Sequence, residues 1–244
     1  MHARTILVVG VVATALSATT AKGQGYWTKK PWQQWSSNDC RNMLQNSPWA
    51  QTWSNTGMVE TPMGQPSDGT GREQVPEIYY LVQLRSALPV REAVARQAQI
   101  QNKYDRMDAS HKKAFDDSVK GFLTRNYDDD IVVHLDYGSN VTLYERDMMQ
   151  YWQSFPPGVV PMQTYLIGPN GQKLVPARME VAPGGQTAVE FIFARKVNGA
   201  SFIKSGDKSF AFQFMSPAIG TLVAQRAYIE FKPSKMLING QLAY

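Results

Sequence analysis

Residues 187–215, TAVEFIFARKVNGASFIKSGDKSFAFQFM, contain two apolar runs separated by turn signals. In the second run Phe210, Phe212 and Phe214 alternate with smaller residues. A period of two is typical of β-strands, and Asn198-Gly199 between the runs accepts the positive φ angles of a tight hairpin. The stretch therefore predicts antiparallel strands joined by short turns.

The same pattern extends over residues 130–244. Short apolar runs follow one another from IVVHLDY at 131–137 to KMLINGQLAY at 235–244, and Asn170-Gly171 and Asn239-Gly240 provide two more hairpin signals. Six to eight short strands at this spacing favour an antiparallel, immunoglobulin-like β-sandwich. A strand over 77–85 is expected to join it, because Ile78, Tyr80 and Val82 alternate there.

Three helices are expected between residues 76 and 244. Pro89 suits the start of a helix that runs to about Met107, and Asp108 is placed to cap a second helix from about Ala109 to Leu123. A short third helix is expected near residues 143–153. The second helix is expected to bury one apolar side, made of Ala114, Phe115, Val119, Phe122 and Leu123. We therefore expect an α+β fold with a helical insertion at about 89–124.

The N-terminal part differs in composition. Residues 26–53 hold five of the six tryptophans, and Ser36 or Ser37 can cap a short helix that runs to about Gln45. Ser47-Pro48 predicts a second helix, on which Trp49 and Trp53 would share a face. Residues 54–76 are rich in Gly, Pro, Ser and Thr, which indicates a linker. The expected organisation is a signal sequence at 1–21, a tryptophan-rich segment with its linker at 22–75, and a β-sandwich domain at 76–244.

The first residues indicate export. Arg4 precedes an apolar run from Ile6 to Leu16, and Thr19 and Ala21 are small residues suited to cleavage before Lys22. The run is shorter than the roughly 18 apolar residues that a membrane helix needs, and no later stretch is longer. We expect a periplasmic or extracellular protein without a transmembrane segment in the mature chain.

Charge and cysteine content narrow the function classes. The net charge of +5 falls to +4 when Arg4 is removed, and the basic residues do not cluster, so the sequence does not favour nucleic-acid binding. Cys40 is the only cysteine, so the chain cannot form an internal disulfide. We expect Cys40 to be a small buried apolar residue, with pairing between chains as the alternative.

Metal and cofactor signals are weak. His111 and His134 are far from each other and from Cys40; we expect His111 to be exposed and His134 to be half-buried and hydrogen-bonded. Asp128-Asp129-Asp130 lacks the spacing of a calcium loop, and we interpret it as a solvent-exposed connection between a helix and a strand. No Gly-rich phosphate loop is present, so no metal and no cofactor is expected.

Catalytic signals are also weak. Glu180 and Glu190 can face each other across strands, as the two carboxyl groups of a glycosidase must. Ser201 to Lys204 and Ser205 to Lys208 both match S-x-x-K, but this motif belongs on a helix with partner motifs that the chain lacks. We interpret both matches as coincidence.

The tryptophans are the basis of the one ligand-binding hypothesis that the sequence supports. Indole faces stack on sugar rings, and Trp is enriched at recognition surfaces. The candidate ligand-binding residues are Trp27, Trp32, Trp35, Trp49 and Trp53. The alternative, which we favour, is that these side chains dock the N-terminal segment onto the rest of the protein.

Several segments together resemble a known group of proteins. KPWQQWS, NSPWAQTW, RSALPVREAVAR, the helix end FL before DDDIVVHL, and FKPSKMLINGQLAY resemble exported, uncharacterised proteins of Acidobacteria-type soil bacteria, over most of residues 26–244. The resemblance implies export and one shared architecture, but no activity. From the residues we expect a non-catalytic envelope or secreted binding or scaffold protein, whose partner is a glycan or another envelope protein. The alternative is a polysaccharide hydrolase with an Asp/Glu acid–base pair.

Overall fold

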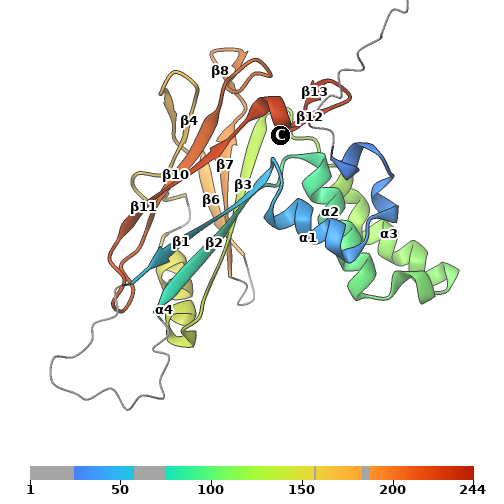
Figure 1. Cartoon of the computed structure of the whole chain (residues 1–244), viewed down its shortest axis with the longest axis horizontal. Helices are drawn as coiled ribbons and strands as arrows, with labels where there is room; N and C mark the ends of the chain where they lie inside the picture. Colours follow the sequence, from blue (N-terminus) through green and yellow to red (C-terminus); the bar gives the residue numbers. More distant parts are fainter. Residues whose placement is uncertain (1–24, 58–74, 157, 183–186) are drawn as a thin grey trace, which may run out of the picture.

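The computed structural model describes residues 25–57, 75–156, 158–182 and 187–244 (Figure 1). The predicted signal sequence at 1–21 and residues 58–74 of the predicted linker lie outside these ranges. The described chain forms an α+β fold with two larger antiparallel sheets, as the sequence predicted. Neither sheet closes into a barrel.

The helices and sheets have the following bounds. The helices are α1 (Ser37–Gln45), α2 (Leu88–Gln101), α3 (Ala109–Thr124) and α4 (Thr142–Gln153), and the 3-10 turns are η1 (Tyr26–Thr28), η2 (Trp32–Gln34), η3 (Tyr104–Arg106) and η4 (Pro233–Lys235). The first sheet has the order β1 (Ala50–Thr56), β2 (Glu77–Leu84), β3 (Asp130–Ser139), β7 (Ala188–Ala194), β6 (Arg178–Val181). The second sheet has the order β11 (Gln225–Phe231), β10 (Phe210–Ser216), β4 (Tyr165–Ile167), β5 (Lys173–Leu174). Two small hairpins pair β8 (Lys196–Val197) with β9 (Ala200–Ser201) and β12 (Leu237–Ile238) with β13 (Gln241–Leu242).

The two sheets meet through aromatic side chains. Phe191 of β7 lies 5.4 Å from Phe212 of β10, and Tyr80 of β2 lies 5.0 Å from Phe214 of β10, measured between ring centroids. All four side chains are fully buried. Alternation along each strand places these rings on the inner face of their sheet. The outer face of the first sheet carries polar residues such as His134 and Glu190 together with the buried apolar pair Val132 and Ile192. Helix α4 packs at one end of this core, where its Trp152 contacts Phe191.

Helices α1 to α3 form a group on one side of the sheets (Figure 1). Of the two serines that the sequence offered as the cap of α1, it is Ser36 that caps the helix, in a capping box with Asp39. Cys40 of α1 is buried, which agrees with its interpretation as a small apolar residue. Burial raises the pKa of its thiol to about 11.

The helix predicted from Ser47-Pro48 is wrong, because Ala50–Thr56 is the edge strand β1. This strand pairs with β2 without interruption from Ala50↔Gln83 to Thr56↔Glu77. Ser47 closes the preceding turn instead: its hydroxyl donates to the Met43 carbonyl oxygen at 2.7 Å and accepts from the Trp49 amide at 3.2 Å. Strand pairing outweighs the local signal of a proline at a first helical position.

The helices predicted over residues 89–107 and 109–123 are present as α2 and α3, with two differences. Helix α2 ends at Gln101 rather than near Met107, because Lys103 adopts a left-handed conformation with φ of 55°. Helix α3 has its predicted Asp108 cap, and its predicted apolar side is covered only in part: Phe115, Val119, Phe122 and Leu123 are half-buried, and Ala114 is exposed. Arg91 of α2 attaches the end of α3 by donating to the carbonyl oxygens of Phe122 and Leu123.

A buried polar network joins the two sheets. Ser216 at the end of β10 lies 2.7 Å from the Tyr80 hydroxyl oxygen and accepts from the Asn55 side-chain amide at 3.2 Å. Asn55 also donates to the Val223 carbonyl oxygen at 2.9 Å. These contacts connect β1 and β2 of the first sheet to β10 and the segment after it, and they satisfy polar groups that burial would otherwise leave unpaired.

Replacing Ser216 with alanine tests this network. Ser216→Ala leaves the buried Tyr80 hydroxyl without its oxygen partner, so we expect the free energy of unfolding to fall by about 1–2 kcal/mol. Denaturant titration followed by circular dichroism measures the change. The matched control, exposed Ser205→Ala, should stay within about 0.5 kcal/mol. Equal stability of both variants would mean that the network does not stabilise the fold.

Candidate functional site

The structure separates the five predicted tryptophans. Trp35 and Trp49 are fully buried, and Trp27, Trp32 and Trp53 are partly buried against the core. Trp53 lies between the two sheets, 5.7 Å from Tyr80 and 6.1 Å from Phe214. It is therefore apart from the others and contributes to the contact between the sheets.

Trp27, Trp35 and Trp49 belong to one packed group. Tyr26 lies edge-on to Trp27 at 5.3 Å and to Trp35 at 5.5 Å, and Trp27 lies edge-on to Trp49 at 5.4 Å. The indole of Trp49 donates to the Ala243 carbonyl oxygen near the other end of the chain. These contacts are of the kind that would dock the N-terminal segment onto the rest of the protein, which is the alternative that we favoured from the sequence.

Trp32 has a different setting, between two hollows. One hollow, of about 370 Å³, is also lined by Trp27 and Glu92, and the other, of about 470 Å³, by Arg96 and Asp116. We call these two hollows together the Trp32 groove. An indole that is only partly buried between two concavities can offer a ring face to a ligand. Of the five tryptophans, Trp32 is the one that lines both hollows.

Fixed polar groups line the larger hollow of the Trp32 groove. Arg96 is held by two hydrogen bonds, from Nε to the Trp35 carbonyl oxygen at 3.0 Å and from Nη1 to Gln99 Oε1 at 3.1 Å. The Tyr104 hydroxyl donates to Asp116 Oδ2 at 2.8 Å. Donors and acceptors that are already held in place beside an apolar ring lose little conformational entropy when a ligand binds.

Glu92 gives the smaller hollow a titratable group. Burial raises the pKa of this carboxyl to about 7, although the neighbouring Arg91 lowers it. Glu92, Trp27, Trp32 and Trp35 line the same hollow. A carboxyl in aromatic surroundings that is part protonated at neutral pH can donate a proton as well as accept a hydrogen bond.

The carboxylates that the sequence singled out lie on the outer face of the first sheet. Glu180 and Glu190 are direct cross-strand neighbours, as expected. Each also has a cationic or ring partner: Arg178 Nε donates to Glu180 at 2.9 Å, and His134 Nδ1 lies 3.2 Å from Glu190. The His134 bond lowers the pKa of Glu190. His134 is half-buried and hydrogen-bonded and His111 is exposed, both as predicted.

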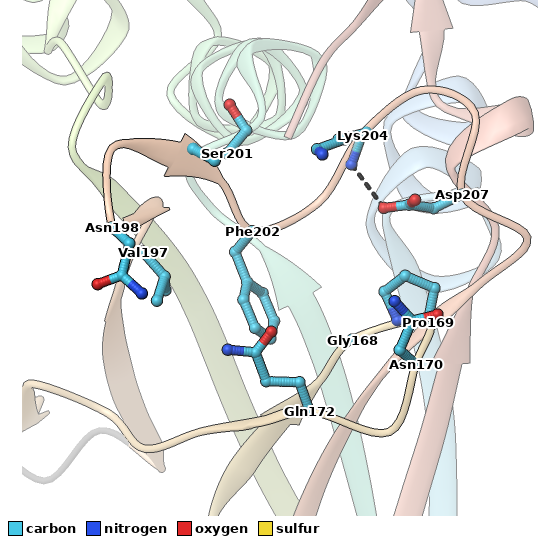
Figure 2. Close-up of a pocket in the computed structure, with 11 residues that line it drawn as sticks. Gly168, Pro169, Asn170, Gln172, Val197, Asn198, Ser201, Phe202, Lys204 and Asp207 are labelled. Atoms are coloured by element: carbon cyan, nitrogen blue, oxygen red, sulfur yellow. Dashed lines mark hydrogen bonds between the residues drawn. The ribbon is translucent and has the colours of Figure 1, made fainter.

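A third hollow, shown in Figure 2, contains one of the S-x-x-K matches. Ser201 belongs to strand β9, and Lys204 follows in a loop where its backbone amide donates to Asp207 Oδ2 at 2.7 Å (Figure 2). The motif therefore does not lie on a helix, which agrees with its interpretation as coincidence. The hollow measures about 240 Å³.

Sequence reasoning missed Glu92 and Arg96, because a half-exposed face of α2 gives them no signal beyond helical spacing. Among the described residues no group of three or more His, Cys, Asp or Glu side chains is placed to hold a metal ion. No described helix is long and apolar enough to cross a membrane. Comparisons of the chain with protein-family models, with curated proteins and with solved structures find no match.

Proposed function

We propose that this is an exported, non-catalytic protein that binds a glycan in the Trp32 groove. The observation that carries the proposal is the placement of Trp32 between two hollows whose other walls carry Arg96, Gln99, Asp116 and Glu92. A sugar ring has an apolar face of C–H groups and an edge of hydroxyls. An indole with planar polar groups around it complements both parts.

Export is the second part of this proposal, and it rests on Arg4 and the apolar run Ile6–Leu16. For the fold, we propose an immunoglobulin-like β-sandwich. Two antiparallel sheets whose aromatic faces meet support it. Such folds host many binding modules, so the architecture is compatible with the proposal without deciding it.

Trp32→Ala tests the binding proposal. The tryptophan fluorescence of the mature protein is followed with acrylamide quenching against a panel of glycans, and the glycan that protects best is titrated. Removal of the indole should weaken binding of that glycan about tenfold, since a stacked ring contributes roughly 1–2 kcal/mol.

Tyr228→Ala is the matched control for this substitution. Tyr228 is an exposed aromatic residue of β11, outside the residues that line the Trp32 groove, and its removal should leave affinity unchanged. Equal affinity of Trp32→Ala and the native chain would reject the groove. If no glycan of the panel changes the quenching, the proposed ligand class is wrong.

A second candidate function, polysaccharide hydrolysis, is favoured by one observation. Glu92, with its raised pKa, lines the groove beside Trp32, and Asp105 and Asp116 line the hollow on the other side of that ring. Glu92 would be the general acid, and the second carboxylate of the pair would have to lie within about 10 Å of it. Release of reducing ends from the bound glycan, abolished by Glu92→Gln, would establish the hydrolase in place of the binding protein.

Glu92→Gln can also be tested without a ligand, through the pH dependence of its free energy of unfolding. Because folding raises the pKa of Glu92 from 4.5 to about 7, the folded chain binds this proton more tightly than the unfolded chain. The stabilisation that the folded state gains from binding this proton is complete below pH 4.5 and is lost as the pH rises through 7. The neutral glutamine has no such loss, so relative to the native chain the variant should gain about 1–2 kcal/mol between pH 4 and pH 8, after allowance for partial exposure.

Guanidinium titrations of both proteins at pH 4, 6 and 8 measure this difference. The control is Glu230→Gln on strand β11, which likewise replaces a carboxyl by an amide but at an exposed position outside the Trp32 groove. An offset between Glu92→Gln and the native chain that does not change with pH would show that Glu92 is not a buried proton donor.

A further inference from the structure

Glu92 of α2 is the acidic side chain in the lining of the smaller hollow of the Trp32 groove. Among the described residues none donates a hydrogen bond to its carboxylate, and the charge that acts on it is that of Arg91. The side chain is half-buried, but it is not one of those whose unpaired polar atoms are fully enclosed. The carboxylate therefore loses much of its hydration and still remains within reach of a ligand in the hollow.

Two indoles line the same hollow as this carboxylate. Trp27 and Trp32 are each partly exposed, whereas Trp35, the third indole of the lining, is fully buried and offers no ring face to a ligand. The face of an indole attracts cations through its ring quadrupole, and an unpaired carboxylate attracts them through its charge. A carboxylate beside two accessible indoles therefore favours a ligand group that is cationic and carried on an apolar frame.

The cationic side chains around the hollow are matched within the protein. Lys30 lines the hollow, but its Nζ is ion-paired with Asp39 of α1 at 2.6 Å. Arg91 does not line the hollow: its guanidinium donates to carbonyl oxygens at the end of α3 and lies 4.8 Å from the ring centroid of Tyr127. The other described residues of the lining are uncharged. Glu92 is thus the charged group of this lining that a ligand can still match.

We propose that the smaller hollow binds the ammonium group of an amine-bearing sugar, between the Glu92 carboxylate and the faces of Trp27 and Trp32. This inference rests on the proposed glycan site and names the class of glycan that the site takes. The ammonium N–H groups donate to Glu92, and the apolar face of the sugar ring packs on Trp32. The following sugars extend along the larger hollow, which Trp32 also lines.

The larger hollow does not provide a comparable group. Each of its acids has a partner in the protein: the Tyr104 hydroxyl donates to Asp116, and ion pairs join Asp105 to Arg96 and Asp117 to Lys113. These paired carboxylates can accept hydrogen bonds from sugar hydroxyls without a strong preference for a cation. Discrimination between an amine and a hydroxyl is therefore assigned to Glu92.

Proton release accompanies this mode of binding. Burial raises the pKa of Glu92 to about 7, and an ammonium group in contact with the carboxylate lowers that pKa again, because it stabilises the charged form. Below pH 7 the ligand must therefore displace a proton from Glu92. Lys30 stays paired with Asp39, and Arg91 stays bonded to carbonyl oxygens, so neither of these cations accounts for the released proton.

Three tetrasaccharides with the same backbone linkage test this inference on the mature protein at pH 6, where sugar amines are protonated. They are the chitosan tetramer, which carries amines, its N-acetylated form, and cellotetraose, which has hydroxyls at the same position. Calorimetric titration should show that the chitosan tetramer binds at least about threefold tighter than either neutral form. Titration in two buffers of different ionisation enthalpy should show release of up to about one proton, with the chitosan tetramer only.

Variants of Glu92 locate the ammonium group. Glu92→Gln removes the charge and keeps the shape, so the ratio of the affinities for the chitosan tetramer and cellotetraose should fall to about one and the proton release should disappear. Glu92→Asp retains a carboxyl and should keep part of both effects. The matched control, exposed Glu230→Gln on β11, should change neither. If Glu92→Gln does not fold, the affinity ratio and the proton release of Glu92→Asp and of the native protein still decide.

The outcomes separate this inference from the proposed function on which it rests. Equal affinity of the native protein for the chitosan tetramer and cellotetraose, with both weakened by Trp32→Ala, would overturn the inference and leave the glycan site in place. A preference or a proton release that persists in Glu92→Gln would also overturn it, because the ammonium group would then bind elsewhere. If neither these tetrasaccharides nor any glycan of the wider panel binds, the proposed function itself fails.

Discussion

The contact between the aromatic faces of the two sheets is the constraint on which the rest of the fold depends. Phe191 against Phe212 and Tyr80 against Phe214 commit the inner face of the first sheet to the core. Its outer face then has to carry the polar side chains of the same strands, including Gln83 of β2 and His134 of β3. Helices α1 and α2 cover part of that outer face. A hollow of about 370 Å³ remains where these helices meet it, lined by Arg41, Gln83 and Asp136 among others.

The Trp32 groove is assembled from helical and 3-10 segments around one indole. Arg96 is hydrogen-bonded to the Trp35 carbonyl oxygen and to Gln99, and Tyr104 is hydrogen-bonded to Asp116. Several polar side chains of the groove are therefore already held in place by the protein itself.

Sequence predicted the elements whose signals are local. A serine cap for α1 at residue 36 or 37, the Asp108 cap and the positive φ angles at Asn198-Gly199 and Asn239-Gly240 follow from the chemistry of a few adjacent residues. Strand β1 was mistaken for a helix because its conformation is decided by pairing with β2, which no local window contains. Of the candidate tryptophans, sequence could not tell Trp32 from buried Trp35 and Trp49. Spacing does not reveal which ring the rest of the chain covers, and Glu92 becomes noticeable only through its surroundings.

Helix α3 is held unlike any other helix of the described chain. It buries none of its residues, and Arg91 fixes its C-terminal end through carbonyl oxygens. Its apolar side chains are only half-buried, whereas those on the inner faces of the sheets are fully buried, so we expect α3 to open more easily than the sheets. Amide hydrogens of α3 should therefore exchange with solvent through local opening rather than global unfolding. Since α3 forms one wall of the larger hollow of the Trp32 groove, the width of the groove can change while the two sheets stay intact.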